Sequence, residues 1–260
     1  RALIALPVLF AALKMKNTEK VEWRLLKPYI ISGSILGFGW LTLFYGYKHT
    51  SISSAVILYN MCPVYVMIAA PLLLKEAISK IQIAVVFFSF LGLVLIVGQN
   101  LSEGYGYLGM ALSAVSGMLY ATIILINRSI KSRVDNQTGT FVQISAAMIV
   151  LLPFVLAEGD ISTIRDLNAA AVIYTILLGV LHTGIVYTIF FSLTTQMRSV
   201  EIVLYSYLEP LFGILFSVIF IGEKLTVLQI IGGTFILGST FIGEILKNKK
   251  KPALPSAMQT

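Results

Sequence analysis

The residue with the clearest chemical potential is Glu209, which interrupts the otherwise uncharged stretch 202–222. It is the only acidic or basic residue deep within such a stretch, where a charged side chain would cost about 2.5–3.5 kcal/mol to insert into a membrane. Its carboxyl group should therefore face a polar interior, where desolvation favours the protonated form and makes proton exchange feasible. Glu209 is a candidate for proton coupling. The alternative is a neutral, hydrogen-bonded Glu that stabilises a kink at Pro210. Tyr205 lies one helical turn earlier on the same face.

Other polar or amphipathic side chains also lie in the middle of uncharged stretches: Trp40, Tyr59, Asn60, His182 and Tyr187. Aromatic residues near the ends of membrane spans usually anchor them at the interface, and these residues are too deep for that role. Together with Tyr205 and Glu209, they are candidates for a cavity that binds an organic solute. The alternative for each is packing within the protein interior.

The stretches that carry these residues are long enough to cross a bilayer. The chain has 260 residues, of which 57% are hydrophobic and 12% charged, and its mean hydropathy is +0.89. This composition excludes a soluble globular domain, a disordered chain and a nucleic-acid-binding domain. About 20 apolar residues span the bilayer as a helix. Uncharged runs cover 28–47, 49–74, 81–102, 104–127, 136–157, 167–197 and 225–243, to which the interrupted run 202–222 and the short run 2–13 are added. We therefore expect an all-α polytopic membrane protein with about nine helices in this fragment.

The positive charges indicate an orientation. If the loop after the first span is cytoplasmic, most of the 19 Lys and Arg residues lie on the cytoplasmic side, as the positive-inside rule requires. We expect a multi-pass protein of a bacterial plasma membrane, with residues 247–260 forming a basic cytoplasmic tail.

The sequence also contains a weak internal repeat. A shift of 147 positions aligns Pro63 with Pro210, Glu76 with Glu223 and Gln82 with Gln229. The aligned units lie an odd number of crossings apart, so the two halves are inverted, as in secondary transporters. We expect two five-helix units, 1–101 and 104–246, of which the first lacks its first helix. The intact protein would then have ten helices.

Two features of the repeat have structural interpretations. Pro63 and Pro210 lie in mid-span, where each could form a hinge or, alternatively, a packing kink. The quartets that follow the two aligned Glu residues have the S/T-x-x-Q pattern of a helix capping box, and a carboxylate is favourable near a helix N-terminus. The predicted structural caps are Glu76, Ser79, Gln82, Glu223, Thr226 and Gln229.

Two stretches carry a family resemblance. One runs from Tyr59–Pro63 through Glu76–Gln82, and the other from Tyr207–Pro210 through Gly222–Gln229. Each has a mid-helix Pro, a Glu at the helix end and a Gln six residues later. The chain thereby resembles the EamA-like family of the drug/metabolite transporter superfamily, although Lys75 replaces the usual Gly before Glu76. The resemblance implies ten helices in two inverted units around a central cavity, and export or exchange of amino acids, other metabolites or drugs, often driven by protons.

The sequence thus favours a secondary transporter that moves a small organic solute, such as an amino acid or related metabolite, by alternating access with possible proton coupling. A multidrug or organic-cation efflux carrier is the main alternative, followed by a channel or a non-transporting membrane scaffold. An enzyme is not expected, because there is no H-E-x-x-H motif and no paired nucleophile and base. We expect no cofactor, no metal and no nucleic-acid partner. The expected partners are the solute, the bilayer and protons.

Overall fold

The computed structural model is all-helical in the part of the chain that it describes, residues 2–15, 22–50, 52–98, 106–130, 134–158, 168–208, 212, 215–216, 218–219 and 226–249. The helices are α1 (Ala2–Met15), α2 (Trp23–His49), α3 (Ile52–Tyr59), α4 (Cys62–Leu74), α5 (Lys80–Val97), α6 (Tyr107–Ser129), α7 (Asn136–Glu158), α9 (Ala169–Leu177), the π-helix η2 (Leu178–Val186), α10 (Tyr187–Gln196), α11 (Ser199–Ser206) and α13 (Val227–Lys249).

Most of these helices are suited to a membrane. Five helical stretches are long and apolar enough to cross it: Trp23–His49, Ser54–Leu74, Tyr107–Ser129, Asn136–Ala157 and Ala169–Gln196. Shorter apolar helices occupy Ala2–Lys14, Lys80–Ile96 and Val227–Gly243. The fold class predicted from the sequence, an all-α polytopic membrane protein, is confirmed.

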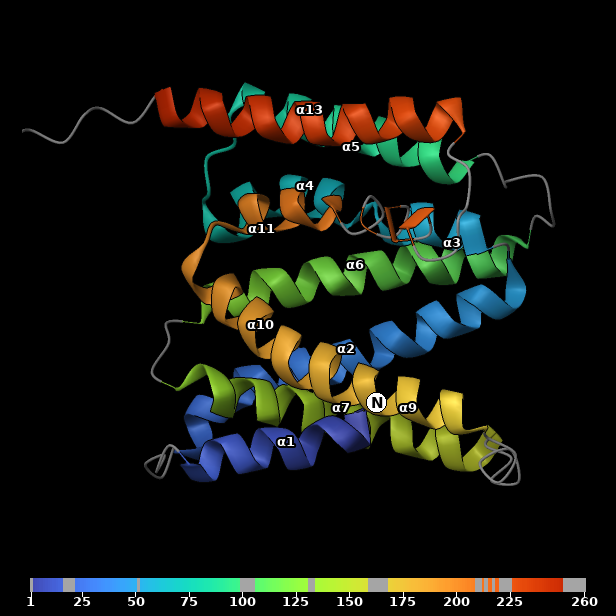
Figure 1. Ribbon diagram of the computed structural model, residues 1–260. Helices are drawn as coiled ribbons and strands as arrows, with labels where there is room; N and C mark the ends of the chain where they lie inside the picture. Colours follow the sequence, from blue (N-terminus) through green and yellow to red (C-terminus); the bar gives the residue numbers. More distant parts are fainter. Residues whose placement is uncertain are drawn as a thin grey trace, which may run out of the picture.

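The spans run side by side, across the view of Figure 1, so that their ends gather on two opposite sides. On the left of Figure 1, α1, α4, α6, α10 and α13 finish, and α2, α5, α7 and α11 begin. Among the described Lys and Arg residues, Lys48 alone lies at the opposite side. We call the left side the basic end and the other side the distal end.

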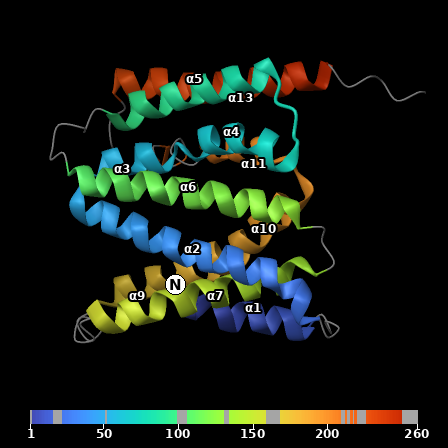
Figure 2. The ribbon, with the colours of Figure 1, turned by 180° about the vertical axis from the view of Figure 1, so that it is seen from behind.

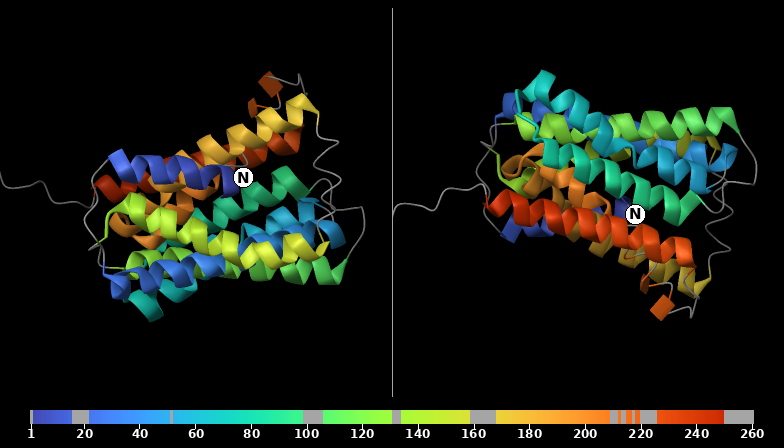
Figure 3. Two further views of the ribbon diagram at one scale, coloured as in Figure 1. Left: turned by 90° about the horizontal axis from the view of Figure 1, so that it is seen from below. Right: turned by 90° about the horizontal axis from the view of Figure 1, so that it is seen from above.

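Helices α5 and α13 form an antiparallel pair, which Figures 2 and 3 show along one edge of the bundle. Ser89 and Ser239 hydrogen-bond across it, 2.9 Å between their hydroxyl oxygens. A Cβ on Gly92 would lie 2.5 Å from the carbonyl oxygen of Gly232, and a Cβ on Gly232 equally close to that of Gly92. Only residues without side chains permit this approach. The helices begin at opposite ends of the bundle, as an inverted repeat requires.

The third span along the chain is interrupted. It starts at the distal end as α3, breaks at Asn60 and Met61, and continues as α4. Pro63 occupies one of the first two positions of α4, where its missing N–H costs little. The break packs against α6 at Gly117, where an added Cβ would lie only 2.7 Å from the carbonyl oxygen of Tyr59. The residue predicted as a hinge thus lies beside a true discontinuity.

A second irregularity lies in the span formed by α9, η2 and α10. Its central nine residues, Leu178–Val186, are a π-helix. The hydroxyl of Thr183 donates to the carbonyl of Leu178 at 3.2 Å. A π-helical segment inside a helix is rare and often marks a functional position. Here the segment contains His182 and ends just before Tyr187.

Candidate functional site

A pocket of about 310 Å³ lies between α2, α3, α6 and the η2–α10 span. Its walls come from the second half of α2, from α3 and its end, from the middle of α6, and from the irregular part of the fifth span. These positions place it in the distal half of the bundle. The lining residues are Trp40, Leu43, Phe44, Tyr47, Val56, Tyr59, Asn60, Tyr120, His182 and Tyr187.

Aromatic rings form two walls of this pocket. On one side, the rings of Trp40 and Tyr187 stack with centroids 5.9 Å apart, and the His182 ring lies 5.2 Å from that of Tyr187. On the other, Tyr120 stacks on Tyr59 at 5.6 Å. Offset or tilted ring contacts at these separations are favourable. The stacking holds rings from different helices in fixed positions around the cavity.

Asn60 is held at the helix break. Its backbone N–H and its side-chain Nδ2 both donate to the carbonyl of Val56, each at 2.9 Å. The side chain therefore closes the last turn of α3 and contributes an amide group to the pocket wall. Asn60 thus adds a polar group to a largely aromatic cavity while the last turn of α3 keeps its hydrogen bonds.

The structure brings together five of the residues predicted from the sequence: Trp40, Tyr59, Asn60, His182 and Tyr187. Tyr205 lies on α11, 43% exposed, and does not line the pocket. Glu209, Pro210 and Glu223 lie outside the described residues, so their predicted roles remain predictions.

Tyr120 lines the pocket but was missed by sequence reasoning. It lies on α6 near the small residues Gly117 and Ala121. Its ring stacks on Tyr59 and, at 6.0 Å, on Phe190. Both partners come from other helices, so the stacking has no signal in the local sequence.

The two predicted capping boxes are formed. In the first, the backbone N–H of Ser79 donates to Gln82 Oε1 and the N–H of Gln82 donates to the Ser79 hydroxyl. Thr226 and Gln229 make the same pair of bonds at the start of α13. Glu76 is placed differently from its predicted role at α5: its carboxylate accepts from Arg128 and from the backbone of Ser199.

Tightly packed side chains separate the pocket from the basic end. Directly beyond Trp40, a core cluster includes Ile123, Ile144 and Phe191. Farther on, the buried Gln143 donates through Nε2 to the Ser32 hydroxyl and to Asn127 Oδ1, both at 2.6 Å. These layers join α2 of the first half to α6 and α7 of the second. In the described part of the chain, these packed layers lie between the pocket and the basic end.

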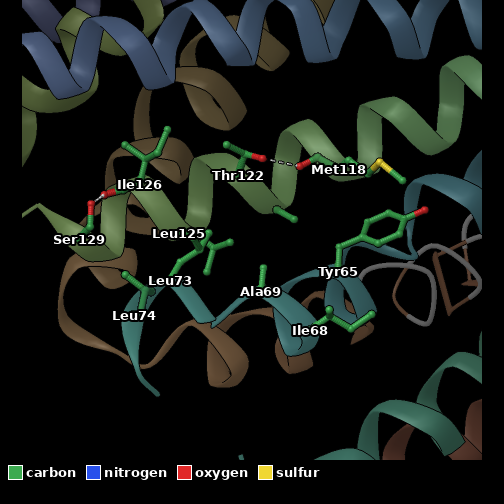
Figure 4. A pocket seen from close by; sticks show the side chains of 11 residues that line it. Tyr65, Ile68, Ala69, Leu73, Leu74, Met118, Thr122, Leu125, Ile126 and Ser129 are labelled. Atoms are coloured by element: carbon green, nitrogen blue, oxygen red, sulfur yellow. Dashed lines mark hydrogen bonds between the residues drawn. The ribbon is translucent and has the colours of Figure 1, made fainter. Parts of the chain in front are cut away.

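A larger pocket of about 500 Å³ lies between α4 and α6 (Figure 4), but its chemistry does not suit a polar solute. Leu73, Ile68 and Met118 are exposed residues of its wall. Two of its hydroxyl groups are used internally, since Thr122 donates to the carbonyl of Met118 and Ser129 to that of Ile126. We interpret it as part of the apolar outer surface.

None of the described residues that line the 310 Å³ pocket carries a permanent charge. Among the described residues, no group of three His, Cys, Asp or Glu side chains is placed to hold a metal ion. Recognition in the pocket therefore depends on aromatic faces, on tyrosine hydroxyls, and on the polar groups of Asn60 and His182.

Comparison with known proteins identifies this arrangement. The family model described as the EamA-like transporter family matches residues 1–98 and again 106–243. The chain belongs to the EamA-like transporter family. It is therefore an integral multi-pass membrane transporter and not an enzyme. This confirms the resemblance inferred from the Pro and Glu-x₅-Gln pattern.

Proteins of similar sequence are also described as transporters. The "Uncharacterized transporter YxxF" of Bacillus subtilis (strain 168) is 28% identical over 219 residues, covering 83% of this chain and 69% of the relative. An "Uncharacterized transporter" of Archaeoglobus fulgidus is 28% identical over 251 residues, covering 93% and 84%. A crystal structure at 17% identity superimposes with a TM-score of 0.80 over 94% of this chain and 86% of that one, which shows a shared fold.

Proposed function

We propose that this EamA-like protein is a secondary transporter that moves a small organic solute through the aromatic pocket by alternating access. The observation that carries the proposal is the convergence of five deep polar or aromatic side chains, together with Tyr120, on one cavity. The cavity lies in the distal half, and packed side chains of the described residues lie on its basic side. Its two prospective moving parts are the broken span at Pro63 and the π-helical span at His182.

The lining favours two solute classes. A volume of about 310 Å³ is at the small end for ligand pockets and suits a solute of amino-acid size. An amino acid or related metabolite with a flat side chain could stack between the two aromatic walls. An organic cation is the second candidate, because tyrosine and tryptophan faces attract cations and the described lining residues carry no permanent positive charge to repel one.

Orientation and coupling complete the proposal. The basic end would face the cytoplasm of a bacterial cell, by the positive-inside rule, which puts the C-terminus inside and the pocket toward the outside. The repeats would be 1–101 and 104–246, followed by the basic tail 247–260. Glu209 would exchange the coupling proton.

The test is counterflow uptake into liposomes, with radiolabelled phenylalanine and tetramethylammonium as probes of the two classes. Tyr187→Leu should raise the KM of the transported probe about 2- to 30-fold, because an aromatic or cation–π contact is worth about 0.5–2 kcal/mol. Tyr107→Leu is the matched control, since Tyr107 is 82% exposed and outside the pocket. Equal KM values in the two folded variants would exclude this pocket as the solute site.

Proton coupling has its own measurement. Glu209→Gln should abolish uptake driven by a pH gradient while leaving counterflow, which needs no driving force. Undiminished gradient-driven uptake in this variant would remove Glu209 from the coupling mechanism.

A further inference from the structure

The loop after α4 makes a set of contacts at the basic end that capping of α5 cannot explain. Glu76 Oε1 accepts from Arg128 Nε at 3.1 Å, and Oε2 accepts from the backbone N–H of Ser199 at 3.2 Å. The Glu76 side chain is 10% exposed and that of Arg128 29%. Arg128 also donates through a terminal nitrogen to the carbonyl of Thr195 at 3.1 Å. An ion pair this sheltered, with additional hydrogen bonds, is stronger than one on an open surface.

These contacts connect the two halves. Glu76 belongs to the first matched segment, whereas Arg128, Thr195 and Ser199 belong to the second. A further contact runs in the opposite direction, from the Arg198 guanidinium to the carbonyl of Ala77. All of them lie where α4 ends and α11 begins, so they hold together the ends of two helices from opposite halves.

The start of α11 depends on Glu76. Arg198 occupies the N-cap position, and its side chain makes no capping hydrogen bond, as expected for a residue that can only donate. The Glu76 carboxylate takes over that role from the other half of the molecule. A negative charge there also interacts favourably with the helix dipole. Separating α4 from α11 would break the ion pair and uncap α11 together.

We propose that Glu76 is a positioning residue that holds the basic side of the transporter closed, and that its bonds to Arg128 and Ser199 break when the pocket opens to that side. The inference rests on the proposed alternating access, because only that mechanism requires the basic side to open. Among the described residues, the packed layers lie on the basic side of the pocket. The Glu76 contacts lie at the basic end itself, where they hold α4 and α11 together.

Cysteine accessibility tests this without knowledge of the solute. Ser199→Cys, in a Cys62→Ser background, provides a reporter: residue 199 is fully buried, and its hydroxyl makes no hydrogen bond among the described residues. The protein is placed in lipid nanodiscs, where both ends are open to a membrane-impermeant maleimide. Adding Glu76→Gln should increase the labelling rate about tenfold, the equilibrium factor for losing roughly one charge-assisted hydrogen bond. Arg128→Lys should act in the same direction.

The matched control is Glu22→Gln, which removes an exposed carboxylate from the same end and should leave the rate unchanged. A second reporter, Val56→Cys in the pocket wall, should be labelled more slowly when Glu76→Gln is present, because the two sides open alternately. Retained thermal unfolding shows that each variant is folded. An unchanged labelling rate at residue 199 in both Glu76→Gln and Arg128→Lys would overturn the inference. Faster labelling at both reporters would also overturn it, because it would show that the whole fold had become more accessible. Neither result depends on the solute, so a failed uptake assay leaves this test intact.

Discussion

Replacing Gly117 by alanine should displace the broken span and damage the pocket. The new Cβ would lie 2.7 Å from the carbonyl oxygen of Tyr59 and 3.1 Å from that of Leu58. Ordinary contact begins near 3.4 Å, so in a close-packed interior the Tyr59 carbonyl must move by roughly 0.7 Å. Tyr59 carries one of the stacked rings of the pocket wall, and its ring would move with the backbone.

The expected change in the free energy of unfolding is the difference between two contributions. Glycine to alanine within a helix is favourable by about 1 kcal/mol, whereas overpacking costs about 1–3 kcal/mol. Gly39→Ala isolates the first term, because its Cβ would meet only Leu119 Cβ at an ordinary 3.7 Å. Gly117→Ala should therefore be about 1–3 kcal/mol less stable than Gly39→Ala. For a chain of this size, each kcal/mol corresponds to about 2–4 °C in Tm.

The assay is thermal unfolding of both variants in the same detergent, followed by uptake kinetics of the folded proteins. Gly117→Ala should have a lower Tm than Gly39→Ala and a raised KM. Gly39→Ala should show neither a reduced Tm nor a raised KM. Equal Tm values and equal KM values would show that the break does not rest on α6 as described, and would refute the reasoning that connects Gly117 to the pocket.

Two other substitutions test neighbouring parts of the fold by thermal unfolding. Gly232→Ala should have a lower Tm than Gly238→Ala. A Cβ at position 232 would lie 2.5 Å from the Gly92 carbonyl oxygen, whereas a Cβ at position 238 would have nothing within 4 Å. Equal Tm values in the two variants would argue against the antiparallel α5–α13 contact. Lys75→Gly should raise the stability by about 0.5–1 kcal/mol. Lys75 has φ of 55°, a conformation that costs a residue with a side chain about 1–2 kcal/mol, and the greater freedom of glycine in the unfolded chain offsets only part of the gain from removing this cost. A lower Tm would mean that the Lys75 side chain stabilises the protein by more than its backbone conformation costs.

Local sequence signals predicted the helices well and the contacts between them poorly. The uncharged runs located the spans, and the Ser79 to Gln82 quartet located the start of α5, because hydrophobicity and capping act over a few residues. The partner of Glu76 is Arg128, 52 positions later, so the sequence suggested only the nearer helix end. Likewise, a uniformly apolar span carries no periodicity that could have revealed the π-helix at His182.

The residues that line the candidate pocket could be predicted from a different signal. Trp40, Tyr59, Asn60, His182 and Tyr187 could be predicted because polar or amphipathic groups are expensive at membrane depth unless they face an interior. Tyr120 has the same character, but it lies among residues typical of helix packing. An aromatic residue at membrane depth is therefore a candidate lining residue even where the rest of its helix face consists of small residues.

The uncharged pocket lining has a consequence for electrical measurements. Since none of the described lining residues carries a permanent charge, these residues add nothing to the current when the pocket changes sides. With a neutral solute, any net current would have to come from an ion bound elsewhere, for which Glu209 is the candidate. With a monovalent cation, each turnover would move one charge through the membrane field, worth about 2.3 kcal/mol per 100 mV. In Glu209→Gln, where the proposed proton coupling is removed, voltage dependence would thereby distinguish a zwitterionic solute from a cationic one.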